Sequence, residues 1–278
     1  MSTPRIAAIH DMSGFGRCSL TVAIPILSAM GLQCCPVPTA FLSTHTGGFE
    51  GFTFHDMTDE MPKIADHWQS LGLEFQAIYS GFLGSERQID IVADFIRRFR
   101  TPRTTVVVDP VMGDDGVAYQ TYTPAMCEGM KHLAELADVI TPNLTEAAFL
   151  LGRDYGDLPR DEIGLRRLAE ELSLGGRRSV ALTGVSLSPR KTGVMCFDAA
   201  TGETSAVQTV FVAHPLYGTG DVFASVLTGG LVKGDPLPVA ARRAAEFVRE
   251  CAVRTVEQDL PLSEGVDFEP LLGALMDR

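Results

Sequence analysis

The chain has 278 residues, of which 45% are hydrophobic and 21% are charged. A chain of this length can bury about three-quarters of its unfolded surface, and this composition excludes disordered, collagen-like and coiled-coil proteins. Its 23 lysines and arginines against 35 aspartates and glutamates leave a formal net charge of −12. That charge disfavours nucleic-acid binding, because it repels a polyanion, but it leaves room for a small anion held by backbone amides.

Neither a signal peptide nor a membrane span is indicated. The apolar stretch that follows Arg5 is interrupted by Asp11, which makes it too short for the core of a signal peptide. No other window approaches the roughly 18 apolar residues that span a bilayer. The six cysteines include no CxxC pair and match no zinc or disulfide framework, so we expect reduced thiols. These patterns predict a cytoplasmic protein without a membrane partner.

Short apolar runs alternate along the chain with segments of helical periodicity, which is typical of a mostly parallel sheet with helices on both faces. The strands expected in chain order are Ile6–His10, Cys35–Phe41, Phe75–Ser80, Thr104–Asp109, Val139–Thr141 and Ser179–Thr183. Two later runs, Gly193–Asp198 and Thr204–Val212, predict a hairpin at the edge of the sheet. No linker or repeat divides the chain, so we expect a single α/β domain over residues 1–278.

Four segments carry apolar stripes at the spacing of an amphipathic helix. Ser85 and Gln88 have the spacing of a capping box and precede the first of these stripes. The stripes are Ile89, Val92, Ala93, Ile96 and Phe99; Met57, Met61, Ile64, Ala65, Trp68 and Leu71; Leu165, Leu168, Ala169 and Leu172; and Ala244, Ala245, Val248, Ala252 and Val256. The basic cluster at 97–103 ends the first of these helices, where we interpret it as a solvated face.

The most informative motif is Gly218-Thr219-Gly220-Asp221, which precedes apolar residues at helical spacing. Glycines permit a tight turn, and the first free amides of the following helix converge on one point, where the helix dipole also attracts an anion. Asp221 would stand beside this anion hole and could accept a proton from a hydroxyl that attacks a bound phosphoryl group. The alternative is that Asp221 only caps the helix.

Two further motifs place polar side chains at the ends of expected strands. Asp109 ends one strand in Asp-Pro-Val-Met-Gly-Asp, and Thr141, Asn143 and Glu146 follow the next in Thr-Pro-Asn-Leu-Thr-Glu. Ligands bind at this edge of an open parallel sheet, and oxygen ligands of this kind suit Mg²⁺ that bridges to nucleotide phosphates. Helix capping is again the alternative for Asn143 and Glu146, but three such strand ends favour one shared cleft.

Taken together and in this order, the motifs resemble those of the ribokinase superfamily, and specifically its vitamin-kinase branch. The segment Phe41-Leu42-Ser43-Thr44-His45-Thr46-Gly47 is similar to the Ser-Asn-His-Thr segment of pyridoxal kinases, and Tyr79-Ser80-Gly81-Phe82-Leu83-Gly84 resembles their Ser-Gly-Tyr-Leu-Gly. The resemblance extends from about residue 5 to about residue 255. It implies a ribokinase-like fold and transfer of the γ-phosphoryl group of ATP, with Mg²⁺, to the 5′-hydroxyl of pyridoxal, pyridoxine or pyridoxamine.

The same resemblance implies roles for individual residues. Asp221 would be the catalytic base, and the amides of Gly218, Thr219, Gly220 and Asp221 would form the anion hole. Asp109 and Glu146 would hold Mg²⁺, and the ATP site would comprise Asp109, Thr141, Asn143, Glu146, Thr183 and Tyr217. For Thr183 a plain strand terminus is the alternative. Positioning and charge stabilisation carry most of the catalysis in phosphoryl transfer, which fits this set.

The acceptor side would comprise Asp11, Ser13, His45, Thr46 and Phe82. His45 would hydrogen-bond the ring substituents of the vitamer, with a satisfied structural histidine as the alternative. Phe82 would pack on the pyridine face, with ordinary core packing as the alternative.

The first strand departs from the pyridoxal-kinase pattern. Asp11-Met12-Ser13-Gly14 is closer to the Asp-x-Ser-Gly of hydroxymethylpyrimidine kinases, where pyridoxal kinases usually have a serine. A carboxylate here would attract a protonated amine, so we hypothesise that amine-bearing substrates are preferred. The alternative is that Asp11 caps the following helix through the amides near Ser13. A dinucleotide fingerprint is excluded because Ser19 stands where the third glycine would be, and no P-loop motif occurs.

Three further expectations concern the whole protein. Members of the branch are typically homodimers without the large β-lid of sugar kinases, and the short hairpin at 193–212 agrees with a reduced lid. Hydroxymethylpyrimidine (phosphate) kinase is the alternative activity. A catalytically silent ligand sensor on the same fold is a second alternative, which the intact Asp221 disfavours.

Overall fold

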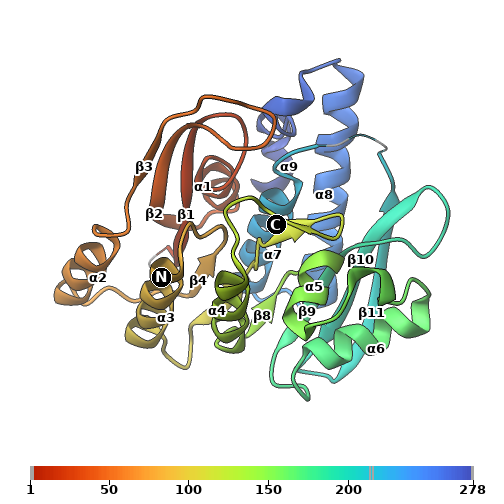
Figure 1. The fold of residues 1–278 in the computed structure, drawn as a ribbon, viewed down its shortest axis with the longest axis horizontal. Coiled ribbons are helices and arrows are strands. Elements are labelled where there is room, and N and C mark those ends of the chain that lie inside the picture. Colours follow the sequence, from red (N-terminus) through yellow and green to blue (C-terminus); the bar gives the residue numbers. More distant parts are fainter. Residues whose placement is uncertain (1–2, 213, 215, 277–278) are drawn as a thin grey trace.

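The computed structural model describes residues 3–212, 214 and 216–276 and contains one nine-stranded sheet (Figure 1). The strand order across the sheet is β11-β10-β9-β8-β5-β4-β1-β2-β3. The strands are β1 (Arg5–Phe15), β2 (Gln33–Thr44), β3 (Phe54–Asp56), β4 (Ala77–Ser80), β5 (Thr105–Val108), β8 (Val139–Ile140), β9 (Ser179–Val185), β10 (Lys191–Asp198) and β11 (Glu203–Val210). The six strands from β9 to β2 are parallel, whereas β3, β10 and β11 each run antiparallel to a neighbour. The predicted mostly parallel α/β architecture is confirmed.

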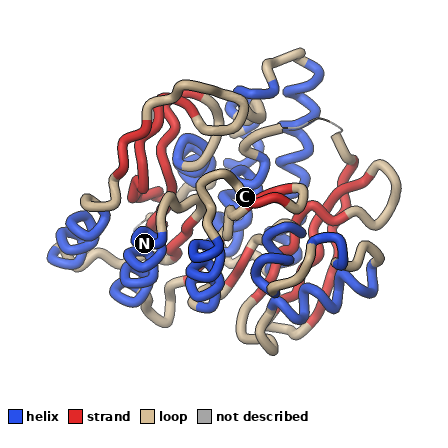
Figure 2. The backbone as a smooth tube through the Cα atoms, in the orientation of Figure 1, coloured by secondary structure: helices blue, strands red, loops and turns tan. Residues whose placement is uncertain are grey.

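Figure 2 shows the helices gathered on both sides of the strands. The α-helices are α1 (Leu20–Ala29), α2 (Met61–Ser70), α3 (Glu86–Phe99), α4 (Pro124–Glu135), α5 (Leu144–Leu151), α6 (Glu162–Leu172), α7 (Thr219–Val232), α8 (Leu237–Glu257) and α9 (Gly273–Met276). Short 3₁₀ turns occupy Tyr155–Asp157, Leu262–Glu264 and Glu269–Leu271, and a separate hairpin comprises β6 (Gly113–Asp114) and β7 (Val117–Ala118). None of the described helices combines the length and the apolar character that a bilayer span needs.

Alternation of side chains along the central strands divides the interior into two cores. On β5, Val106 and Val108 pack with α2 to α6, whereas Val107 faces the core that contains α1, α7 and α8. Successive strand residues point to opposite faces, and both faces here are covered by helices. This burial explains why the strands are continuous apolar runs in the sequence.

The predicted strands are all present, and β1, β2 and β9 extend beyond their expected ends. A register shift between His10 and Met12 marks a bulge in β1, after which β1 and β2 stay paired as far as Phe15 and Thr44. β3 pairs with the far part of β2. The predicted hairpin is confirmed as β10 and β11 at the sheet edge. The sequence did not predict that β1 continues past His10, because Asp11 and Ser13 interrupt the apolar run. A strand beyond a bulge need not be apolar.

The Ser85–Gln88 pair forms only half of the expected capping box. The hydroxyl of Ser85 accepts a hydrogen bond from the Gln88 amide at 3.3 Å, as predicted. The side chain of Gln88, however, accepts from the Gly84 amide at 2.7 Å and donates to the Thr39 carbonyl at 2.9 Å. Gln88 is buried and ties α3 to β2, so tertiary contacts replace the local cap.

Candidate active site

The sheet order brings the predicted strand-end residues to one edge. Moving across the parallel strands, Thr183 lies on β9, Thr141 follows β8, Asp109 follows β5 and Phe82 follows β4; Asp11 lies on β1 and His45 follows β2. Because the carboxyl ends of parallel strands share an edge, the sequence order of the motifs becomes a spatial row. The nucleotide-binding candidates occupy the β9–β5 half of this row, and the acceptor-binding candidates occupy the β4–β2 half.

Asp221 lies in the first turn of α7, beside the middle of this row. The backbone amide of Ser19 lies near its carboxylate and favours the charged form. Burial raises the pKa of Asp221 to about 7, the Ser19 amide opposes this rise, and the nearby Asp109 and Asp11 carboxylates add to it. A carboxylate with a pKa near neutrality is suited to accept a proton from a hydroxyl and to release it again.

The turn before α7 is shaped as the glycine motif predicts. Gly218 has φ +76°, and a Cβ there would lie 2.1 Å from the carbonyl oxygen of Arg17. The first amide bonded inside the helix is that of Val222, which donates to the Gly218 carbonyl at 3.0 Å. The amides of Thr219, Gly220 and Asp221 precede it, and amides at these positions have no partner within a helix. They are therefore placed to bind an anion beside the Asp221 carboxylate.

Asp109 keeps one carboxylate oxygen for a further ligand. Its Oδ1 accepts a hydrogen bond from the Thr141 hydroxyl at 2.8 Å, and no described residue hydrogen-bonds its Oδ2. Burial raises the pKa of Asp109 to about 7, which the Thr141 hydroxyl opposes. A bound cation would favour the charged form of this carboxylate.

Asn143 and Glu146 form the capping box of α5. The Asn143 side chain accepts from the Glu146 amide at 2.9 Å, and Glu146 Oε2 accepts from the Asn143 amide at 2.8 Å. Glu146 Oε1 accepts from the amide of Met112 at 3.0 Å, so both carboxylate oxygens bind backbone. Burial and the neighbouring Asp109 raise the pKa of Glu146. Asn143 and Glu146 therefore cap α5, as the alternative interpretation expects. A metal could bind Glu146 only through the lone pairs that these hydrogen bonds leave free.

Asp109 and Glu146 fit a cation that is held mainly by waters and by the phosphates of the substrate. Among the residues that the structure describes, no group of three or more histidine, cysteine or acidic side chains could hold a metal. Mg²⁺ in kinases is commonly bound by one or two carboxylates together with waters and substrate phosphates. Asp109 with its uncommitted oxygen, assisted by Glu146, fits that arrangement.

Asp11 is buried and holds the start of α1 in place. Its Oδ1 accepts from the Ser19 hydroxyl at 2.5 Å, and its Oδ2 accepts from the Ser13 hydroxyl at 3.1 Å. Burial raises the pKa of Asp11, and these two hydroxyls oppose the rise. Asp11 thus binds hydroxyls, which corrects the alternative of capping through amides. Ser19 lies beside both acids, since its hydroxyl donates to Asp11 and its amide favours the charged form of Asp221.

His45 is almost fully buried, with both ring nitrogens engaged. The Nε2 atom lies 2.7 Å from the carbonyl oxygen of Ser263, and Nδ1 accepts from the Gly47 amide at 3.2 Å. These partners select the neutral tautomer with its proton on Nε2. Burial lowers the pKa of His45, which stabilises the neutral form further. The ring therefore makes the contacts expected of a structural histidine whose hydrogen bonds are satisfied within the protein. The neighbouring Thr46 is exposed.

The remaining candidates divide between the two halves of the row. The Thr183 amide donates to the Pro142 carbonyl at 2.8 Å, which places Thr183 beside the β8 end. Phe82 is half-buried and packs near Tyr122, with ring centroids 6.2 Å apart. Tyr217 lies against the loop after β2, since its ring centroid is 5.3 Å from that of His45. Its assignment to the ATP site stays a prediction, and its observed neighbours belong to the acceptor half.

Sequence reasoning missed Ser19 as a site residue. Ser19 has φ +54°, and its hydroxyl does not cap its own helix because it binds Asp11. The available signal was a serine directly before the apolar run of α1, which is a helix-start pattern.

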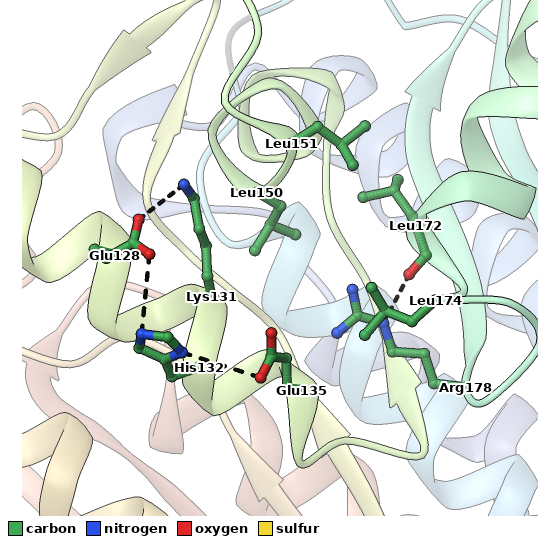
Figure 3. Close-up of a pocket in the computed structure, with 9 residues that line it drawn as sticks. All are labelled: Glu128, Lys131, His132, Glu135, Leu150, Leu151, Leu172, Leu174 and Arg178. Atoms are coloured by element: carbon green, nitrogen blue, oxygen red, sulfur yellow. Dashed lines mark hydrogen bonds and ion pairs between the residues drawn. The ribbon is translucent and has the colours of Figure 1, made fainter.

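A surface pocket lies elsewhere, between α4, α5 and α6 (Figure 3). Figure 3 shows Lys131 and Glu135 on α4 at one side of the pocket and the hydrogen bond from Arg178 to Leu172 at the other. Arg178 is buried and donates to the carbonyls of Leu172 and Ala134, near the ends of α6 and α4. This arginine satisfies helix-end carbonyls, and the pocket contains none of the predicted site residues.

Comparison with known proteins identifies the family. The family model described as phosphomethylpyrimidine kinase matches residues 24–265. The chain belongs to this kinase family. It is 30% identical over 270 residues to the pyridoxine/pyridoxal/pyridoxamine kinase of Bordetella bronchiseptica, covering 91% of this chain and 89% of the relative. It is 34% identical over 172 residues to the hydroxymethylpyrimidine/phosphomethylpyrimidine kinase of Haemophilus influenzae, covering 60% and 61%.

Two solved structures resemble the whole fold of this family member. A Bacteroides thetaiotaomicron protein, provisionally described as a phosphomethylpyrimidine kinase and crystallised with pyridoxal, gives a TM-score of 0.93 at 44% identity, covering 99% and 96% of the two chains. Pyridoxal kinase from Lactobacillus plantarum gives 0.91 at 29% identity, covering 99% and 97%. The resemblance to ribokinase-like vitamin kinases is confirmed.

Proposed function

We propose that this kinase transfers the γ-phosphoryl group of ATP to the 5′-hydroxyl of a B6 vitamer: pyridoxal, pyridoxine or pyridoxamine. The observation that carries the proposal is Asp221, which lies beside the free amides of α7 with a pKa near neutrality. Relatives named as B6 kinases, and a 44% identical structure that contains pyridoxal, support this choice of acceptor.

In the proposed reaction the acceptor hydroxyl binds near Asp221, between the two halves of the strand-end row. Asp221 accepts the hydroxyl proton as the oxygen attacks the γ-phosphorus, and the bond from the γ-phosphorus to the oxygen bridging to the β-phosphate breaks to release ADP. The amides of Thr219, Gly220 and Asp221 stabilise the charge on the transferred group. Mg²⁺, held by Asp109 and Glu146, would neutralise phosphate charge. Thr141, Asn143 and Thr183 would place the nucleotide from the β8 and β9 ends.

A panel assay tests the acceptor. ADP production is measured with each of the three B6 vitamers and with hydroxymethylpyrimidine, with and without Mg²⁺. We expect Mg²⁺-dependent turnover with at least one vitamer at a higher kcat/KM than with the pyrimidine. Higher kcat/KM with the pyrimidine would establish the second candidate, hydroxymethylpyrimidine kinase, which the Asp11-Met12-Ser13-Gly14 segment and the Haemophilus influenzae relative favour.

The metal assignment has its own test. Asp109→Asn and Glu146→Gln should each raise the Mg²⁺ concentration that gives half-maximal rate, more strongly for Asp109 because it has an uncommitted oxygen. An unchanged Mg²⁺ titration in both variants would mean that Glu146 only caps α5 and that Asp109 only accepts the hydrogen bond from Thr141.

We propose further that the protein is a homodimer, as the resemblance to its branch implies. Light scattering coupled to gel filtration should give a mass near twice that of the 30.0 kDa chain. A monomeric mass at micromolar concentration would contradict this assembly.

A further inference from the structure

The segment 262–269 near the end of the chain lies against three loops of the candidate site. We call this segment the C-terminal strap. Its Ser263 carbonyl binds the His45 ring at 2.7 Å, its Glu264 carbonyl accepts from the Arg17 amide at 2.9 Å, and its Val266 amide donates to the Tyr217 carbonyl at 3.2 Å. The strap thus joins the loops that follow β1 and β2 to the turn before α7.

The strap is fixed at its far end. Val266 and Phe268 are fully buried in the core that contains α1, α7 and α8. Asp267 is also buried, and its amide donates to the Thr255 hydroxyl of α8 at 2.8 Å. A second bond joins Asp267 Oδ2 to Arg254 of α8 at 2.6 Å. These contacts hold the strap on the body of the protein, so it can act as a fixed support for the loops it touches.

Arg17 is the side chain that ties the loop after β1 to this support. Its guanidinium donates to both carboxylate oxygens of Glu269, at 2.9 and 2.8 Å, and to Asp267 Oδ1 at 3.1 Å. Only 23% of the Arg17 side chain is exposed, and charge-assisted pairs of this kind are the strong ones.

The backbone around Arg17 is packed too closely to move independently of the site. A Cβ at Gly16 would lie 2.3 Å from Cδ2 of His45, and a Cβ at Gly218 would lie 2.1 Å from the Arg17 carbonyl oxygen. A Cβ at Gly265 of the strap would lie 2.8 Å from that same oxygen. A displacement of Arg17 would therefore be transmitted to His45 and to the anion-hole turn.

We propose that Arg17 and the C-terminal strap position the acceptor half of the active site. The strap holds the His45 ring in one tautomer and so fixes the loop that carries Thr46 and Gly47. Arg17 holds the strap against the turn before α7. Arg17 is a positioning residue in this arrangement, because it acts through His45 and Gly218 and needs no contact with the substrate. The inference rests on the proposed function only for the identity of the acceptor.

The test compares acceptor binding with nucleotide binding in Arg17→Ala. Calorimetry with the acceptor alone should show a dissociation constant raised roughly fivefold to fiftyfold, with the ADP dissociation constant changed less than about twofold. The acceptor KM should rise by a similar factor, with a smaller fall in kcat. Arg17→Lys, which keeps the charge but loses the forked geometry, should recover part of the affinity. Arg153→Ala, which breaks an exposed ion pair with Glu171, is the matched control.

Two results would overturn the proposal: an acceptor affinity in Arg17→Ala equal to that of the wild type, or equal losses of acceptor and nucleotide affinity. If Arg17→Ala fails to fold, Glu269→Gln replaces it, since the half-exposed Glu269 can be changed with little loss of packing. A smaller rise in the acceptor dissociation constant is then expected, and no rise would overturn the proposal. The wild type is assayed first, and the acceptor it uses becomes the probe. Turnover of the pyrimidine alone would therefore refute the B6 assignment without affecting this test.

Discussion

The proposed reaction depends on one carboxylate, that of Asp221. It lies near the Ser19 amide and the acidic side chains of Asp11 and Asp109, and burial raises its pKa to about 7. Asparagine at this position keeps the shape and most hydrogen bonds but cannot accept the proton. Since general-base catalysis typically contributes about 10²- to 10⁴-fold, kcat of Asp221→Asn should fall within that range while ADP still binds.

Steady-state kinetics and calorimetry on the same preparation check this prediction. Asp161→Asn is the control, because Asp161 is an exposed N-cap residue of α6 and asparagine caps helices equally well. An Asp221→Asn enzyme that kept more than half of the wild-type kcat would exclude Asp221 as the base.

A second prediction concerns Asp11 and the selectivity between acceptors with and without an amine. The Asp11 carboxylate accepts from the hydroxyls of Ser13 and Ser19. Asparagine keeps the shape and loses the charge; its oxygen can accept from one hydroxyl, and its NH2 group can donate to the other. If the carboxylate attracts a protonated amine, Asp11→Asn should lower kcat/KM for pyridoxamine relative to pyridoxine by roughly tenfold or more. An unaltered ratio of the two kcat/KM values would mean that Asp11 only holds Ser19 in place and does not select the substrate.

The start of α7 gives a prediction at the scale of one element. Gly218 has a positive φ and lies against the Arg17 carbonyl, whereas a Cβ at Gly220 would meet no atom within 4 Å. Gly218→Ala should therefore destabilise the fold by more than about 2 kcal/mol, through backbone strain and steric overlap together. Gly220→Ala should preserve or raise stability, because alanine favours the helix. Urea unfolding of both variants separates these effects, and equal stabilities would contradict the role given to Gly218.

The helices differ in how clearly their sequences predict them. The helix α3 was predictable because Ile89, Val92 and Ile96 form a stripe opposite charged residues. The helix α1 was not, since it is apolar except for Thr21 and Ser28 and contains Pro25, so its sequence shows no amphipathic pattern. Strand-end acids such as Asp109 were found from their motifs. The partners of His45 could not be found, because the Ser263 carbonyl is 218 residues away and any residue type could supply it.

At the scale of the whole molecule, the buried acids predict how stability depends on pH. Burial raises the pKa of Asp109 and Asp221 to about 7 and also raises those of Asp11 and Glu146. The unfolded chain releases these protons near pH 4. Between about pH 4 and pH 7 the folded state therefore binds more protons than the unfolded state, and these groups lower stability as the pH rises.

Removing one of these acids should restore the stability that this acid loses as the pH rises. Asp221→Asn should raise Tm relative to the wild type by a few degrees at pH 8 and by less at pH 5. Calorimetric scans at the two pH values check this, with the surface variant Asp161→Asn measured alongside. A Tm difference that is the same at both pH values would show that Asp221 is not strained by its burial.

The contact between Arg17 and the strap also has a consequence for biosynthesis. β1 is made first and lies between β2 and β4, whereas residues 262–269 follow every strand of the sheet in chain order. A nascent chain can thus assemble the strand-end row and the α7 turn before His45 gains its Ser263 partner. Acceptor affinity should accordingly arise only when residues 262–269 leave the ribosome, so that incomplete chains do not compete with the finished protein for the acceptor.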